Sequence, residues 1–170
     1  RRQVDHHLAR PGAIGGRSNA HARSEVWPSL EAVERAVSRL YENVTIDLAG
    51  DKDAAVRVER QDLDEMLGNL VENAAKYGHG RVFVTVDPPT GGNVAIQIED
   101  DGPGIDQAQR DQLFTRGTRL DTTGKPGTGL GLAIVRDVAE IYGGSVSLDE
   151  SEDLGGLLVT LSLPEAPQPL

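Results

Sequence analysis

The fold is decided by residues 61–77, which read QDLDEMLGNLVENAAKY. Apolar residues recur in this stretch at the three- and four-residue spacing of one face of an α-helix. They are Leu63, Met66, Leu67, Leu70, Val71 and Ala74. This is the clearest apolar helical stripe in the chain, and it predicts a helix that buries one face against a core.

A polar stripe runs along the same predicted helix. Its members are Asn69, Glu72, Asn73 and Lys76, at positions i, i+3, i+4 and i+7. A helix places this spacing on one side, beside the apolar stripe. Amide and carboxylate oxygens suit Mg²⁺, and an ammonium group suits phosphate. A solvated polar face would show the same pattern, but two asparagines in mid-helix need a reason because Asn is a poor helix former.

The rest of the chain alternates between pairs of strands and single helices. Helical spacing predicts further helices at residues 30–41, 107–114 and 130–141. Apolar runs predict strands at residues 23–27, 44–48, 56–58, 82–86, 94–98, 146–148 and 157–163. This order favours an α+β fold, a two-layer α/β sandwich in which three helices cover one face of a mixed sheet of about five strands.

Three segments divide the chain. Residues 1–20 are expected to be the end of a helix followed by a flexible linker, because Pro11-Gly12 and Gly15-Gly16 interrupt any regular structure. Residues 21–163 form the predicted domain, and residues 164–170 a Pro-rich tail. Since residue 1 is not Met, we expect the chain to be a fragment.

Composition excludes several classes of function. The formal net charge of −10 argues against a nucleic-acid binder, which would carry a basic face. The chain has no cysteine, so disulfides, thiol nucleophiles and Cys-based metal sites are excluded. No apolar run approaches the roughly 18 residues of a membrane span. We therefore expect no membrane contact by this chain.

A second polar motif follows the strand predicted at residues 94–98. It reads Glu99-Asp100-Asp101-Gly102-Pro103-Gly104. A carboxylate at a strand end can accept a hydrogen bond from an exocyclic amine such as that of adenine, and the glycines allow the backbone to approach a flat ring closely. An ordinary Asp-Gly turn is the alternative.

A third motif, Gly127-Thr128-Gly129-Leu130-Gly131, opens the helix predicted at residues 130–141. Backbone N–H groups and the helix dipole make such a start an anion site. Arg116, Arg119 and Lys125 precede it and favour a phosphate clamp on a lid. The pattern is neither the dinucleotide G-x-G-x-x-G nor a P-loop. A flexible hinge is the alternative.

The motifs together resemble a known family. Residues 69–77, 100–105, 114–119 and 127–132 resemble, in this order, the N, first G, F and second G boxes of the catalytic and ATP-binding domain of bacterial sensor histidine kinases. Residues 99–105 and 116–122 particularly resemble the PhoQ type of these kinases. That domain belongs to the GHKL group of gyrase, Hsp90, histidine kinase and MutL ATPases. The resemblance runs from about residue 22 to residue 163 and implies the Bergerat ATP-binding fold.

The resemblance assigns roles to individual residues. It implies that Asn73 binds Mg²⁺ with help from Asn69, that Lys76 contacts phosphate, that Tyr77 lies beside adenine and that Asp100 accepts the adenine amine. Asn73, Lys76 and Arg119 are the catalytic candidates. The other implied nucleotide contacts are Gly102, Gly104, Lys125, Gly127, Thr128, Gly129, Leu130 and Gly131, with Phe114 anchoring the lid and Gly155-Gly156 preceding the last strand.

One position favours phosphoryl transfer over hydrolysis. In the gyrase and MutL branches, a glutamate four residues before the metal-binding asparagine activates water, and here that position is Asn69. Glu72 is a further candidate base. A GHKL-type ATPase and a nucleotide-sensing module without transfer are the alternative functions.

The implied partners lie outside the chain. His6 and His7 do not match the family's phosphoacceptor box, and too few residues separate them from the domain for a second hairpin helix. The acceptor histidine is therefore expected on a dimerisation domain missing from this fragment, and the final acceptor on a response regulator. The parent protein is expected to be a homodimer in the bacterial inner membrane with this domain, monomeric by itself, on the cytoplasmic side.

Overall fold

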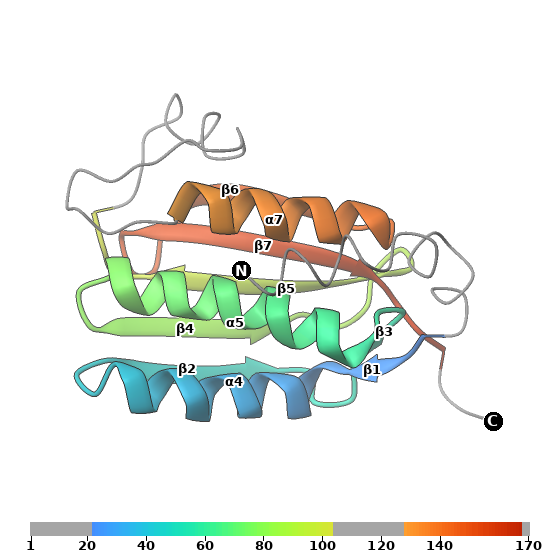
Figure 1. Cartoon of the computed structure of the whole chain (residues 1–170), viewed down its shortest axis with the longest axis horizontal. Coiled ribbons are helices and arrows are strands. Elements are labelled where there is room, and N and C mark those ends of the chain that lie inside the picture. The colour runs from blue at the N-terminus through green and yellow to red at the C-terminus, as the bar shows by residue number, and fades with distance from the viewer. Residues whose placement is uncertain (1–21, 104–127, 168–170) are drawn as a thin grey trace.

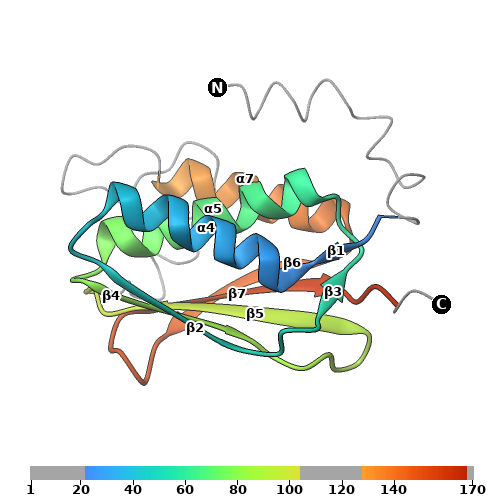
Figure 2. The ribbon, with the colours of Figure 1, turned by 90° about the horizontal axis from the view of Figure 1, so that it is seen from below.

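The computed structural model describes residues 22–103 and 128–167 of the chain. In this part, three long helices lie on one face of a five-stranded sheet, and the other face of the sheet is left open (Figures 1 and 2). The predicted sandwich with a mixed sheet is confirmed. In chain order the elements are β1 (Ser24–Glu25), α4 (Val26–Leu40), β2 (Thr45–Gly50), β3 (Ala55–Val56), α5 (Arg60–Tyr77), β4 (Arg81–Val86), β5 (Asn93–Asp100), α7 (Thr128–Ile141), β6 (Ser145–Glu150) and β7 (Leu157–Pro164).

The sheet has the strand order β2-β4-β5-β7-β6. The edge pair β2 and β4 is parallel, and every other neighbouring pair is antiparallel. The predicted hairpin-like pairing of β4 with β5 is confirmed, with Val84 opposite Ile98. Strand β5 lies in the centre, so Asp100 at its end stands where strands from both sides converge.

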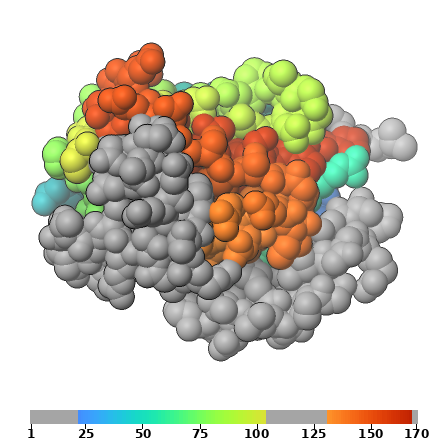
Figure 3. Space-filling model, turned by 90° about the horizontal axis from the view of Figure 1, so that it is seen from above, coloured from blue at the N-terminus to red at the C-terminus, as the bar shows by residue number. Residues whose placement is uncertain are grey.

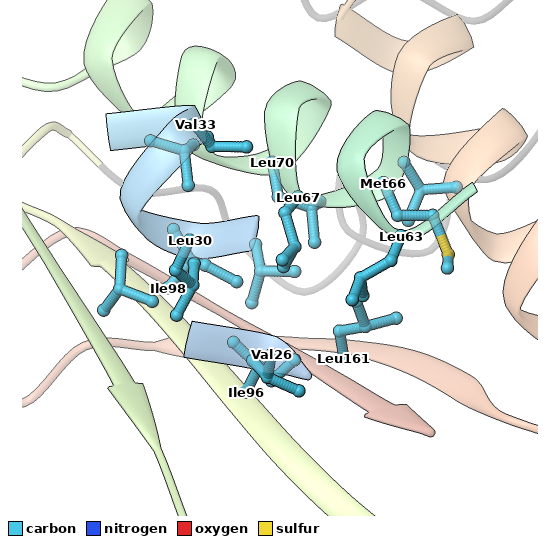
Figure 4. Packing of buried hydrophobic residues seen from close by; sticks show 14 of the residues in the cluster. Val26, Leu30, Val33, Leu63, Met66, Leu67, Leu70, Ile96, Ile98 and Leu161 are labelled. Atoms are coloured by element: carbon cyan, nitrogen blue, oxygen red, sulfur yellow. The ribbon is translucent and has the colours of Figure 1, made fainter. Parts of the chain in front are cut away.

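The core lies between the helices and the sheet (Figure 4). The apolar stripe predicted on α5 is buried throughout, from Leu63 to Ala74. It packs between α4, which contributes Leu30, and strands β5 and β7, which contribute Ile96 and Leu161. Burial of such side chains is the main term that holds the layers together.

The helix α4 begins earlier than predicted. The expected strand at residues 23–27 is only β1, and the helix starts at Val26, so that Pro28 lies in its first turn. Proline is tolerated there because the first-turn N–H groups have no partner within the helix. Val26 is fully buried and continues the spacing of Leu30 and Val33 toward the N-terminus, which is the sequence signal for the earlier start.

A separate two-stranded sheet connects the start of the domain with its end. Strands β1 and β3 pair antiparallel, with Ser24 opposite Val56, in place of the strand predicted at residues 56–58. Val56 also forms a bridge with Glu165, and Ala166 N donates to Ala55 O at 2.9 Å. The first residues of the predicted tail therefore pack onto the domain. The division into segments stays a prediction.

No helix among the described residues has the length and apolar character needed to cross a membrane. The linker at residues 1–20 and the helix predicted at residues 107–114 lie outside the described part of the chain.

Candidate functional site

The polar stripe of α5 lies at the edge of the core. Asn69, Glu72, Asn73 and Lys76 are each half-buried, whereas the apolar residues beside them are buried. A freely solvated face would be more exposed, so the four side chains line a partly enclosed region. The helix α5 thus carries a core face and a functional face side by side.

Asn73 faces the beginning of α7. A Cβ placed on Gly131 would lie 3.8 Å from Asn73 Nδ2, so the two helices approach each other here. The Nδ2 atom is buried and has no hydrogen-bond partner within residues 22–103 and 128–167. Buried polar groups without a partner are rare in folded proteins, and a bound anion, a water molecule or an acceptor atom of a ligand can accept from this amide nitrogen.

Glu72 is held by a contact from another helix. Tyr41, directly after α4, donates its hydroxyl to Glu72 Oε2 at 3.1 Å. Partial burial raises the pKa of Tyr41, and the nearby Glu72 carboxylate adds to the increase. The phenol therefore stays protonated and occupies one oxygen of this candidate base.

Lys76 and Tyr77 end the helix. The Lys76 ammonium lies over the ring of Tyr77, 5.9 Å from its centroid. Both side chains are half-buried. A cation at the C-terminus of a helix is favoured by the helix dipole, so the fold tolerates a positive charge here before any anion binds.

Asp100 is buried at the end of β5, with 6% of its surface exposed. Its Oδ1 accepts hydrogen bonds from Gly102 N at 2.8 Å and from Leu157 N at 3.3 Å. In the described part of the chain, Asp100 Oδ2 accepts no hydrogen bond. Burial raises the pKa of Asp100, and the two backbone hydrogen bonds offset part of this increase.

Two glycines make room for the Asp100 carboxylate. A Cβ on Gly156 would lie 2.4 Å from Asp100 Oδ1, and a Cβ on Gly102 would lie 2.5 Å from Tyr77 O. Any side chain at these positions would collide with backbone. Gly102, one of the glycines expected to allow close approach of a flat ligand ring, thus allows close approach of the Tyr77 backbone.

Asp101 connects the end of β5 with the loop after α5. Its Oδ1 accepts from His79 N at 2.7 Å and from Arg81 N at 3.1 Å. Burial raises the pKa of Asp101, but the backbone hydrogen bonds and the nearby His79 together outweigh it, so the pKa lies below its ordinary value. The Asp101 carboxylate therefore holds the segment at His79 and Arg81 against the end of β5.

The glycine motif at residues 127–131 is partly described. The first turn of α7 contains Thr128, Gly129 and Leu130 as backbone, and Gly131 faces Asn73. Helix α7 lies alongside β6 and β7 and forms one surface with them (Figure 3). Six predicted residues lie outside the described part of the chain: Gly104, Phe114, Arg116, Arg119, Lys125 and Gly127.

Sequence reasoning missed a polar contact at the other end of the same helix pair. Tyr142, just after α7, donates its hydroxyl to Asp62 Oδ2 in the first turn of α5. Asp62 is fully buried and Tyr142 is 6% exposed. Asp62 beside the apolar stripe was a signal that a partner was needed, since a buried carboxylate requires one.

A second missed contact joins β5 to the turn between β6 and β7. Ser151 Oγ donates to Glu99 Oε1 at 2.7 Å, and both residues are buried. Nothing in the sequence pairs positions this far apart.

Comparison with known proteins agrees with this geometry. Residues 58–167 match the family model of histidine kinase-, DNA gyrase B- and HSP90-like ATPases. Among curated proteins, the chain is 50% identical over 106 residues to the sensor protein kinase CarS of Pseudomonas aeruginosa, covering 62% of this chain and 23% of CarS. It is 33% identical over 156 residues to the sensor protein PhoQ of Escherichia coli K12, covering 91% of this chain and 32% of PhoQ. The chain thus spans less than a third of the length of these relatives.

Solved structures of sensor kinases share the fold. The mycobacterial sensor histidine kinase MprB superposes with a TM-score of 0.77 at 26% identity, covering 86% of this chain and 99% of that one. Full-length ShkA in complex with AMPPNP superposes with a TM-score of 0.72 at 26% identity, covering 88% of this chain and 32% of ShkA. The chain therefore belongs to the histidine kinase-, DNA gyrase B- and HSP90-like ATPase family, as a catalytic domain of the sensor histidine kinase type.

Proposed function

We propose that this chain binds Mg-ATP against the polar stripe of α5, the end of β5 and the first turn of α7, and supplies the γ-phosphoryl group to a histidine on a separate dimerisation domain. The observation that carries this proposal is the Asn73 amide, which is buried against α7 with its nitrogen unpaired in the described part of the chain. A bound ligand would complete this amide's contacts. AMPPNP in the related ShkA structure supports an adenine nucleotide as that ligand.

Asp100 is suited to recognise the base. Its Oδ1 is occupied by two backbone donors, so that Oδ2 is the atom available to a ligand. An exocyclic amine, as on adenine, can donate to it, whereas the corresponding carbonyl oxygen of guanine would repel it. Tyr77 stands at the adjacent helix end, beside the Gly102 backbone.

The amide side chains on α5 suit a divalent cation. Asn73, with Asn69 one turn before it, would hold Mg²⁺, which prefers oxygen ligands and keeps water and phosphate oxygens as the remainder. A Mg²⁺ ion held there would neutralise charge on the phosphates. Lys76, half-buried on the same stripe, would contact the phosphates as a point charge. Arg119 and Lys125 are proposed to add positive charge from outside the described residues.

The chain's own residues favour transfer over hydrolysis. Asn69 cannot act as a base, and Glu72 is engaged by the Tyr41 hydroxyl. Catalysis would then consist of positioning and charge neutralisation. The proposed partners are the dimerisation domain that carries the acceptor histidine and a response regulator that receives the phosphoryl group, both on the cytoplasmic side of a membrane-bound homodimer.

Two measurements test the proposal. In a thermal shift assay, ATP with Mg²⁺ should stabilise the chain, while GTP, or ATP without Mg²⁺, should stabilise it less. Radiolabelled ATP should then label the histidine of an added hairpin domain. Binding without transfer or hydrolysis would favour a nucleotide-sensing module, and rapid phosphate release would favour an ATPase. Equal shifts with ATP and GTP would contradict the role of Asp100.

A further inference from the structure

Glu99 is a buried carboxylate beside the proposed nucleotide site that none of the proposed contacts uses. It precedes Asp100 in β5, and side chains of successive strand residues point to opposite faces. Ile96, Ile98 and Asp100 therefore share the helix-covered face, and Glu99 points to the open face of the sheet. It is nevertheless only 6% exposed.

Ser151 covers Glu99 and organises the turn between β6 and β7. Its hydroxyl donates to Glu99 Oε1 at 2.7 Å and accepts from Leu154 N at 3.0 Å. Its backbone N donates to Gly156 O at 2.7 Å, and its carbonyl accepts from Gly155 N at 2.8 Å. With 1% of its surface exposed, Ser151 connects the whole turn to the end of β5.

The same turn reaches Asp100 on the other face of the sheet. It places Leu157 N 3.3 Å from Asp100 Oδ1 and brings the Gly156 backbone into close contact with the Asp100 carboxylate. The last residues of β5 are thus held from both sides: Glu99 by Ser151 on the open face, and Asp100 by Gly156 and Leu157 on the helix face. Fixing the turn through Glu99 therefore fixes one of the two donors to Asp100.

Stability of the fold does not by itself explain the buried contact between Glu99 and Ser151. In the described part of the chain Glu99 has no ion-pair partner. One hydrogen bond from a hydroxyl offsets only part of the free-energy cost of removing a carboxylate from water. An apolar pair at this position would be expected to support a sheet at least as well. The contact instead provides directional control of the turn, which an apolar pair lacks.

We propose that Glu99 and Ser151 are positioning residues for base selectivity. They hold the turn at residues 151–156 so that Asp100 Oδ1 stays occupied by Leu157 N and Gly102 N, and Oδ2 stays oriented as the acceptor for an exocyclic amine. This inference rests on the proposed adenine-nucleotide function. Without the pair, the turn loosens, the carboxylate rotates and discrimination between amine- and carbonyl-bearing bases relaxes.

The test measures ATP and GTP affinities of the full chain by calorimetry in four variants. Ser151→Ala removes the donor, Glu99→Met removes the acceptor but leaves the bonds within the turn, and Glu99→Gln keeps an acceptor oxygen. Ser147→Ala, an exposed serine of β6, is the matched control. For Ser151→Ala and Glu99→Met we expect the ATP-to-GTP affinity ratio to fall about five- to tenfold, the scale of one net hydrogen bond. Glu99→Gln and Ser147→Ala should keep the wild-type ratio.

A spectroscopic measurement separates positioning from general destabilisation. In the nucleotide-free chain, the Leu157 amide proton should shift upfield in Ser151→Ala and in Glu99→Met, because its hydrogen bond to Asp100 lengthens, and should stay in place in Glu99→Gln and Ser147→Ala. If Ser151→Ala fails to fold, Glu99→Met carries both measurements.

The outcomes distinguish this inference from the proposed function. A wild-type chain that binds ATP, together with variants that keep both the selectivity and the Leu157 signal, overturns the inference and leaves the proposed function intact. A wild-type chain that binds neither nucleotide overturns the proposed function and the selectivity role with it. The inference is supported if Ser151→Ala and Glu99→Met, but neither of the other two variants, show both a lower ATP-to-GTP affinity ratio and an upfield shift of the Leu157 amide.

Discussion

The two ends of the α5/α7 helix pair differ in how their polar groups are satisfied. At one end, the Tyr142 hydroxyl donates to Asp62, and both side chains are buried. At the other end, about three helical turns away, Asn73 Nδ2 is buried opposite Gly131 with no partner among the described residues. Among the described residues, the polar groups at the first end are paired with each other, whereas the second end has a donor without an acceptor.

This difference shows how one helix can serve both the fold and a ligand. A closed, charge-assisted hydrogen bond sets the position of α7 against α5 where solvent is excluded. The unsatisfied amide lies where the proposed nucleotide would enter, and a local cost in stability is common at functional sites. We call the Asp62–Tyr142 end the closed end and the Asn73–Gly131 end the open end. We therefore expect substitutions at the closed end to change the stability of the fold, and substitutions at the open end to change nucleotide binding.

The largest expected effect is at the open end. Asn73→Ala should abolish Mg²⁺-dependent ATP binding, measured by calorimetry, because it removes the proposed metal ligand. The melting temperature should stay the same or rise, since the variant also removes a buried group that lacks a partner. Asn93→Ala in the β4–β5 hairpin is the control. Unchanged ATP affinity in Asn73→Ala would refute the assigned site.

Lys76→Ala tests the charge on the same stripe. We expect it to weaken ATP binding by about 1.5–3 kcal/mol, the scale of a hydrogen bond to a charged group. Lys52→Ala is a matched control, because the Lys52 ammonium also lies over an aromatic ring, that of Trp27, at 5.4 Å. If the two variants lose equal affinity, net charge and not a specific contact explains the effect.

Removing the hydrogen bond at the closed end should lower the stability of the fold. Tyr142→Phe should lower the free energy of unfolding by about 1–3 kcal/mol, because it leaves the buried Asp62 carboxylate without this donor. Tyr41→Phe removes the same kind of contact, to the half-buried Glu72, where water can replace the hydroxyl. It should therefore cost less in urea unfolding, and an equal cost would contradict the distinction between buried and accessible pairs.

Alkaline pH offers a second measurement at the closed end. Burial and the Asp62 contact raise the pKa of Tyr142 well above its usual range. A raised pKa in the folded state means that the stabilising contribution is present below the unfolded value of about 10 and is lost as the pH rises through the folded value. The wild-type chain should therefore lose stability as the pH rises above about 10, and Tyr142→Phe should lose less over the same range.

The smallest effect is expected for Asp100→Asn in the absence of nucleotide. Because the folded pKa of Asp100 is raised, its contribution to stability is present below the unfolded value of about 3.9 and is lost as the pH rises through the folded value. At neutral pH, Asn should keep the two backbone hydrogen bonds and remove the buried charge, so the melting temperature should rise slightly. ATP affinity should fall, because an amide NH₂ would face the base. A lower melting temperature would show that the carboxylate is stabilising.

Local patterns predicted the elements that carry the site. The helix at residues 61–77 and the polar stripe on it follow from side-chain spacing alone, whereas the half-burial of that stripe does not. The placement of Asp100 at a strand end and of Gly131 early in a helix was equally local. The strand expected at residues 23–27 is confirmed only at Ser24–Glu25, because Val26 continues the helical spacing of Leu30 and begins α4.

The remaining features could not be predicted because they join distant parts of the chain. The parallel pairing of β2 with β4, the central position of β5 and the contact of Gly156 with Asp100 depend on how the layers assemble. The partners of Asp62 and Glu99 are likewise long-range contacts. A carboxylate in an apolar segment shows that a partner is needed, but not which residue supplies it.

By itself, the sequence determined which helix holds the amides and the ammonium group, which strand ends in the acidic pair, and which family the motifs resemble, because these depend on spacing within one element. Only the tertiary structure decided that Asn73 is left unpaired against α7 among the described residues, that Asp100 has one oxygen already occupied, and that Asp62 and Glu99 are satisfied from distant segments. The physical reason is that burial and hydrogen-bond satisfaction are properties of packed surfaces, and the surfaces exist only once helices and sheet have come together.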